Sequence, residues 1–173
     1  MMNLREQLRE CLVGRVFILA LGNVDYGDDG LGVRLGERLL AAGMADVTIA
    51  GTTPERYLDG LARERFEHVL FLDAVEFGAA AGSVVFLDAS AIAARFPQIS
   101  THKISLSALS QLAAANGTKA WLLGVEPESL KPRQRLTETV ETTLEVLSSL
   151  LQSLRLQTSL PTAGSQPIAE ARV

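Results

Sequence analysis

The sequence predicts an α/β fold, a three-layer sandwich in which a twisted, mostly parallel five-stranded sheet lies between helices. Two observations predict it. Short apolar runs alternate with longer segments of helical periodicity, as in successive strand–helix units. The run 15–21 (RVFILAL) is apolar without alternation, which is typical of a strand buried on both faces. The chain has 173 residues, a length that fits one domain.

Each expected element follows from a local pattern. Apolar runs bounded by polar residues or glycine predict strands at 15–21, 46–51, 68–74, 82–88 and 119–125. Amphipathic spacing predicts helices at 4–12, 30–43, 53–65, 89–96, 104–116 and 136–154. The segment 76–81 is too short for a crossover helix, so we expect a hairpin that places the fourth strand antiparallel at the sheet edge.

Local signals also predict the ends and buried faces of the helices. Thr53 and Thr137 are expected N-caps, Pro54 a first helical residue, and Gly43 a C-cap. The residues expected on buried helix faces are Leu31, Leu35, Leu39 and Leu40 in one helix and Val140, Leu144, Leu147 and Leu151 in another. We therefore expect one domain over residues 1–156 and a mobile tail over 157–173, where periodicity gives way to Pro, Gly and Ser.

Composition excludes several classes of function. Hydrophobic residues make up 47% of the chain and charged residues 21%, as in globular proteins. The net charge of −4 is scattered, without the basic clusters typical of nucleic-acid binders. No apolar run approaches the roughly 20 residues that span a bilayer, so we expect a cytoplasmic protein without a membrane partner. The single cysteine, Cys11, excludes an internal disulfide and is expected to face the core.

Two adjacent acids, Asp28 and Asp29, follow the first strand and open the next helix. One aspartate at a helix N-terminus is an ordinary cap worth about 0.5 to 2 kcal/mol, and either residue alone fits that interpretation. Together they would repel a phosphate at this position, and GNVDYGDDG does not match the dinucleotide-binding G-x-G-x-x-G pattern. The pattern therefore favours a cation.

Further ligands for a cation come from other segments. Asp73 ends the third strand, at the same carboxyl edge of the sheet, and His102 lies in a loop before a helix. Together with the turn acids they would form an open oxygen and nitrogen site for nickel, zinc or manganese. The alternatives are a turn acid for Asp73 and a solvated loop histidine for His102. His68 opens a strand at the opposite edge and is a poor candidate.

Four segments in this order resemble the hydrogenase maturation endopeptidases, namely GNVDYGDDGLGVR (22–34), FLDAVEFGAAAGSV (71–84), STHKISL (100–106) and LLGVEPESLKP (122–132). The resemblance implies a metal-dependent or aspartic-type endopeptidase that removes the C-terminal extension from the large-subunit precursor of a nickel–iron hydrogenase. It also implies that Asp29, Asp73 and His102 contact nickel already inserted in the substrate, with other divalent ions as substitutes.

The same resemblance suggests roles for further residues. Asp28 would take a proton during hydrolysis, or would cap the helix. Gly22, Asn23 and Gly27 would let the backbone turn tightly beside the peptide, with Asn23 offering its amide. Glu126, after the fifth strand, would contact the substrate, or would be a solvated loop acid.

The sequence departs from the family at the end of the second strand. Relatives commonly have Asp-Gly there, whereas this chain has Ala50-Gly51. Glu55 is close in sequence but falls inside the following helix, so the role of that aspartate is not carried over to it. A missing carboxylate keeps open a non-catalytic, nickel-sensing chaperone or binding module for the same partner. The α/β fold alone is also compatible with a small-molecule hydrolase.

Overall fold

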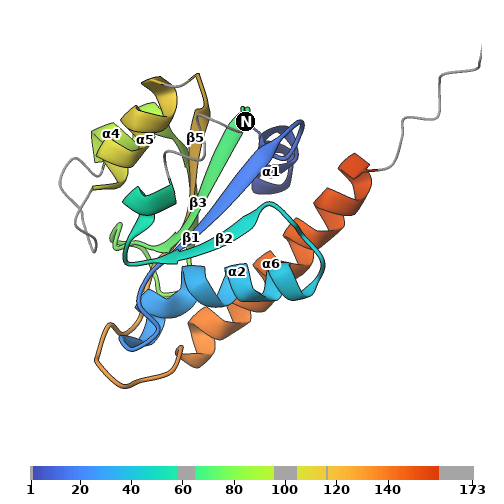
Figure 1. The fold of residues 1–173 in the computed structure, drawn as a ribbon. Helices are drawn as coiled ribbons and strands as arrows, with labels where there is room; N and C mark the ends of the chain where they lie inside the picture. Colours follow the sequence, from blue (N-terminus) through green and yellow to red (C-terminus); the bar gives the residue numbers. More distant parts are fainter. Residues whose placement is uncertain (1, 58–64, 96–104, 116, 160–173) are drawn as a thin grey trace, which may run out of the picture.

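The computed structural model describes residues 2–57, 65–95, 105–115 and 117–159 and confirms the α/β sandwich (Figure 1). Its strands are β1 (Val16–Leu21), β2 (Val47–Gly51), β3 (His68–Ala74), β4 (Val84–Asp88) and β5 (Lys119–Val125). Its helices are α1 (Leu4–Cys11), α2 (Leu31–Ala41), α4 (Ala89–Arg95), α5 (Leu106–Ala115) and α6 (Glu138–Ser159), with 3-10 turns η1 (Gly27–Gly30) and η2 (Pro54–Tyr57).

The sheet has the order β2-β1-β3-β5-β4, with β4 antiparallel at one edge and the other strands parallel. The expected antiparallel edge strand is confirmed, but the expected hairpin is wrong because β5 lies between β3 and β4. The connection instead crosses the end of β5, where the Val75 N–H donates to the Val125 carbonyl (3.0 Å). Strands two places apart are separated by only about 10 Å, which a short extended segment spans.

Two apolar layers cover the faces of the sheet. In Figure 1, α2 and α6 lie on one side and α4 and α5 on the other. Side chains alternate along each strand, so Leu70 and Leu72 pack with α1, α2 and α6, while Val69 and Phe71 pack with α5. Burial on both faces explains why β1 is apolar at every position and why β3 is apolar between His68 and Asp73.

Most expected helices are present, with three differences. The segment after Pro54 begins as a 3-10 turn, and residues 58–64 of the expected helix 53–65 lie outside the described residues. Leu40 is 41% exposed, so it does not share the buried face of Leu31, Leu35 and Leu39. Helix α6 continues to Ser159, beyond the expected boundary at residue 156.

Among the described residues, no helix combines the length and apolar character needed to cross a lipid bilayer.

Cys11 faces the core, as expected. Its side chain is fully buried on α1, and burial raises the pKa of its thiol to about 12. The thiolate is the nucleophilic form, so this residue is unsuited to nucleophilic catalysis at neutral pH.

His68 lies at the amino edge of the sheet, away from the strand ends that carry the acids. Its Nδ1 accepts a hydrogen bond from the indole N–H of Trp121 (2.9 Å). Burial, and next the charge of Lys119, lower the pKa of His68 from its usual value of 6.5, against an opposing effect of Glu67. The neutral ring is therefore the form that the fold favours.

We predict that fluorescence of Trp121, the only tryptophan, reports this contact. The unfolded chain takes up the His68 proton first as pH falls below 6.5, so the free energy of unfolding declines below that value and levels off under the lowered pKa. Protonation of Nδ1 also breaks the indole hydrogen bond. A fluorescence titration should give a midpoint below 6.5, and Lys119→Gln should move it upward. A midpoint at or above 6.5 would contradict the contact.

Candidate functional site

The turn from β1 into α2 folds back onto the end of its own strand. Gly22 has φ +116°, and a Cβ there would overlap the backbone carbonyl of Asp29. The Gly22 N–H donates to the Gly51 carbonyl (3.1 Å), which ties the turn to the end of β2. Glycine at this position therefore lets η1 lie against the carboxyl edge of the sheet.

Asp29, in η1 after β1, and Asp73, on the neighbouring strand β3, both lie at this edge. Asp29 is 8% exposed, and its Oδ2 accepts the backbone N–H of Asn23 (2.8 Å). Asp73 is 1% exposed near the end of β3, which pairs with β1 and contacts η1. A buried carboxylate requires polar or charged partners, and carboxylate oxygens are common ligands of divalent ions.

His102, the expected nitrogen ligand, lies outside the described residues. Among the residues that the structure does describe, no three His, Cys, Asp or Glu side chains form a group able to hold a metal ion. The described part of the site thus contributes two carboxylates, and the role of His102 stays a prediction.

Asp28 points to a different set of partners from its neighbour. Its Oδ2 accepts the backbone N–H groups of Glu128 and Ser129 (both 2.9 Å), and its Oδ1 accepts the N–H of Thr137 (2.7 Å). The Thr137 hydroxyl lies 3.0 Å from Oδ2, and the Asp28 side chain is fully buried. These hydrogen bonds engage both carboxylate oxygens of Asp28. They favour a structural role over proton transfer.

Neither turn acid caps its own helix. The residue at the N-cap of α2 is Gly30, without a side-chain hydrogen bond, and η1 also has none. The prediction that Asp28 caps the helix that follows it is therefore wrong. The carboxylate binds the loop after β5 and the start of α6 instead, where the Glu141 N–H donates to the Thr137 carbonyl (2.9 Å).

Glu126 is not a solvated loop acid, and its contact with a substrate stays a prediction. The residue is 8% exposed, and its Oε2 accepts the N–H groups of Phe77 (2.8 Å) and Ala79 (3.2 Å). Its own backbone exchanges hydrogen bonds with Ser83 and Gly82 (both 2.9 Å). Glu126 therefore fastens the β3–β4 connection across the end of β5, and both interpretations made from the sequence miss this role.

Asn23 and Gly27 shape the turn. The Asn23 Oδ1 accepts the N–H of Asp25 (3.0 Å), which orients the side-chain amide. Gly27 has φ +58°, and a Cβ there would stand 2.6 Å from the Ser129 carbonyl oxygen, so glycine is needed where the two loops meet. Contacts of these residues with a substrate stay a prediction.

Glu55 lies on the turn that follows β2 and has a buried carboxylate oxygen. Ala50, where relatives commonly have aspartate, is 5% exposed within the apolar layer. The turn folds back there, because the Thr53 N–H donates to the Ala50 carbonyl (3.1 Å). On η2, Glu55 has a buried Oε2 that accepts no hydrogen bond within the described part of the chain. A buried oxygen of this kind costs free energy and is typical of sites where a ligand binds. The sequence feature that could have indicated this residue is an acid shortly after the position where aspartate is missing.

Comparison with known proteins identifies the relatives of this arrangement. The family described as hydrogenase maturation protease matches residues 32–153. Hydrogenase 2 maturation protease of Escherichia coli is 31% identical over 151 residues, which cover 82% of this chain and 91% of that protein. Hydrogenase 3 maturation protease of the same species is 26% identical over 137 residues, 78% of this chain and 87% of that protein.

Solved structures show the same architecture. The nickel–iron hydrogenase maturation protease HycI of Thermococcus kodakarensis superposes with a TM-score of 0.77 at 26% identity, covering 87% of this chain and 99% of that chain. The hydrogenase maturating endopeptidase HybD of Escherichia coli gives a TM-score of 0.69 at 30% identity, covering 83% and 94%. The similarity therefore extends over nearly the whole fold of both relatives.

The hydrogen bonds of Asp28 predict that Asp28→Asn destabilises the protein. In the variant, the NH₂ group of asparagine replaces one carboxylate oxygen. At least one backbone N–H that donates to that oxygen in the unaltered protein then faces another donor. A charge-assisted hydrogen bond is lost, and a buried donor is left unpaired. We expect a loss of about 3 kcal/mol in the free energy of unfolding, measured by urea denaturation. Asp25→Asn, the same change on an exposed residue of the same turn, should cost under about 0.5 kcal/mol. Equal small effects would contradict the structural role of Asp28.

Proposed function

The chain belongs to the hydrogenase maturation protease family, and we propose that it cleaves a hydrogenase large-subunit precursor. The reaction is hydrolysis of one peptide bond, which removes the C-terminal extension of a nickel-loaded precursor of a nickel–iron hydrogenase. The observation that carries the proposal is the pair of buried carboxylates, Asp29 and Asp73, at one edge of the sheet.

In this proposal the nickel belongs to the substrate. Asp29 and Asp73 supply oxygen ligands and His102 a nitrogen ligand, a mixed set that suits a borderline divalent ion. A metal bound there polarises a carbonyl or lowers the pKa of a bound water. The Asn23 N–H fixes Asp29 through Oδ2 (2.8 Å), so the carboxylate keeps one orientation before the substrate arrives. Only a precursor that carries the metal completes the set, which couples cleavage to correct loading.

A carboxylate outside this trio is needed to take the proton of the attacking water. Asp28 is engaged by the loop after β5, so its part is to position the turn that bears Asp29. Glu55 is the better candidate for the proton acceptor, since its buried Oε2 accepts no hydrogen bond from the described residues. It also follows β2, whose end is tied to β1 by the Gly22–Gly51 hydrogen bond (3.1 Å). Glu55 would thus supply the carboxylate that is missing at position 50, where this chain has alanine.

The central experiment incubates the purified protein with nickel-loaded and nickel-free precursor and follows mass. We expect the nickel-loaded form alone to lose the mass of its C-terminal extension. Asp29→Asn and Asp73→Asn should each lower the rate at least about 100-fold, because both remove charge from the site. His102→Ala should weaken nickel-dependent binding. Asp25→Asn, on the exposed side of the turn, is the matched control.

Three outcomes would overturn parts of this proposal. Full cleavage by Asp29→Asn would remove its role in contacting nickel. Equal cleavage of both precursor forms would remove the metal dependence and favour aspartic-type chemistry. Binding without cleavage would identify a nickel-sensing chaperone or binding module, the function that the Ala50 departure keeps open.

Glu55→Gln tests the proton acceptor separately. The glutamine keeps the shape but cannot accept a proton, so we expect kcat to fall by about 100-fold or more while binding of the precursor is kept. The acidic limb of the pH–rate profile should disappear as well. Glu10→Gln, the same change on exposed residue 10 of α1, should leave both unchanged. A normal pH profile for Glu55→Gln would exclude it as the base.

A further inference from the structure

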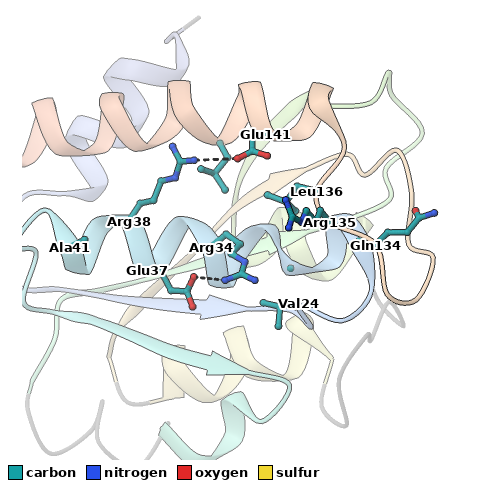
Figure 2. A pocket seen from close by; sticks show the side chains of 12 residues that line it. Val24, Arg34, Glu37, Arg38, Ala41, Gln134, Arg135, Leu136 and Glu141 are labelled. Atoms are coloured by element: carbon teal, nitrogen blue, oxygen red, sulfur yellow. Dashed lines mark hydrogen bonds and ion pairs between the residues drawn. The ribbon is translucent and has the colours of Figure 1, made fainter.

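Helices α2 and α6 run side by side and border a cavity of about 580 Å³ (Figure 2). The cavity is lined by residues of α2 (Arg34, Arg38 and Ala41) and of α6 (Glu141 and Leu144). The loop before α6, through residues 134–136, closes one end. Val24, Gly27 and Gly30 of the β1–α2 turn complete the lining. We call this cavity the α2/α6 groove. Its size admits a few side chains of a partner.

Ion pairs neutralise most charges along this groove. Arg34 contacts Glu37 (3.0 Å), and Arg38 reaches Glu141 (3.4 Å), as the dashed lines in Figure 2 show. Arg135, on the loop that closes the groove, forms no ion pair with any carboxylate of the described residues. The loop end of the groove therefore carries an excess positive charge.

Arg135 belongs to a run of cations in the loop after β5. Lys131, Arg133 and Arg135 alternate along this loop, all three are exposed, and none pairs with a carboxylate in the ranges that the structure describes. We call these three residues the basic loop. It stands out because the whole chain has a net charge of −4. Such a local reversal of sign attracts an acidic partner and orients it.

The basic loop is held in place. The Arg133 N–H donates to the Asp25 carbonyl (2.6 Å), and the Ser129 hydroxyl donates to Oε1 of Gln134 (2.8 Å). Asp28 binds both ends of the loop, at Ser129 (2.9 Å) and Thr137 (2.7 Å). A loop with this many anchors presents its charges without a large loss of conformational entropy on binding.

Apolar side chains accompany the cations. Val24 is 37% exposed beside the groove, and Leu130, next to the basic loop, is 36% exposed. A partner segment that fits this surface combines acidic with apolar side chains. Nucleic acid fits poorly, because Glu37 and Glu141 would face its phosphates. A symmetric second copy fits poorly as well, because it would bring two basic loops together.

We propose that the α2/α6 groove and the basic loop together dock an acidic, partly apolar segment of the protein substrate, at a distance from the bond that is cut. Gly27 and Gly30 line the groove and flank Asp28 and Asp29 in one turn. The docking surface and the carboxylates therefore lie on two sides of the same turn, and a docked substrate is held beside the site. The proposal rests on the proposed function for the identity of the partner.

The test measures binding of the immobilised nickel-loaded precursor to the intact protein by biolayer interferometry. Arg135→Glu should weaken binding about tenfold, and Lys131→Glu should weaken it in the same direction, because each reverses a charge that attracts the partner. Arg5→Glu makes the same charge change on exposed α1, at the opposite edge of the sheet, and should stay within about twofold of the unaltered protein. Circular dichroism checks that each variant is folded.

A second measurement identifies the acidic partner segment. Acidic clusters on the precursor are changed to lysine one at a time, and one such change should restore binding of Arg135→Glu. Equal binding by Arg135→Glu and Arg5→Glu would overturn the proposal. A dimer in solution that Arg135→Glu dissociates would also overturn it, since a second copy would then occupy the groove. Binding without cleavage by the unaltered protein would refute the proposed function and leave the docking surface standing.

Discussion

The structure depends on one buried carboxylate more than on any other polar group. Asp28 joins the β1–α2 turn to the loop after β5 and to the start of α6, through residues 100 to 109 positions away in the chain. Because the side chain is fully buried, both of its oxygens depend on these donors for hydrogen bonds. The same contacts fix the backbone that carries Asp29 and the loop that carries Arg135. A single constraint thus positions both the candidate site and the docking surface.

The two adjacent acids of this turn, Asp28 and Asp29, contact different parts of the structure. Asp28 turns toward the loop between β5 and α6, whereas Asp29 lies against the sheet edge, close to the end of β3. A tight 3-10 turn makes this division possible, because successive side chains along it point in different directions. One acid thus holds the framework, and the other is the one that we propose contacts the substrate, both from a two-residue sequence motif.

A second carboxylate performs a similar structural task on the other side of the sheet. Glu126 receives the backbone of Phe77 and Ala79 and holds the connection that passes over the end of β5. Backbone groups in such a crossing have no strand partner, and a buried carboxylate satisfies two of them at once. The carboxyl edge therefore carries two acids, Asp28 and Glu126, that bind backbone groups of connecting loops, in addition to Asp29 and Asp73.

The sequence by itself determined the alternation of strands and helices, the bounds of β3 and β5, and the edge at which Asp29 and Asp73 gather. These follow from local periodicity and from the rule that parallel strands share one carboxyl edge. Only the tertiary structure decided that β5 lies between β3 and β4, that Asp28 and Glu126 bind distant backbone, and that Glu55 has a buried oxygen. The reason is physical: a hydrogen-bond partner about 100 residues away leaves no periodic trace in the sequence, because any residue can supply a backbone N–H except proline.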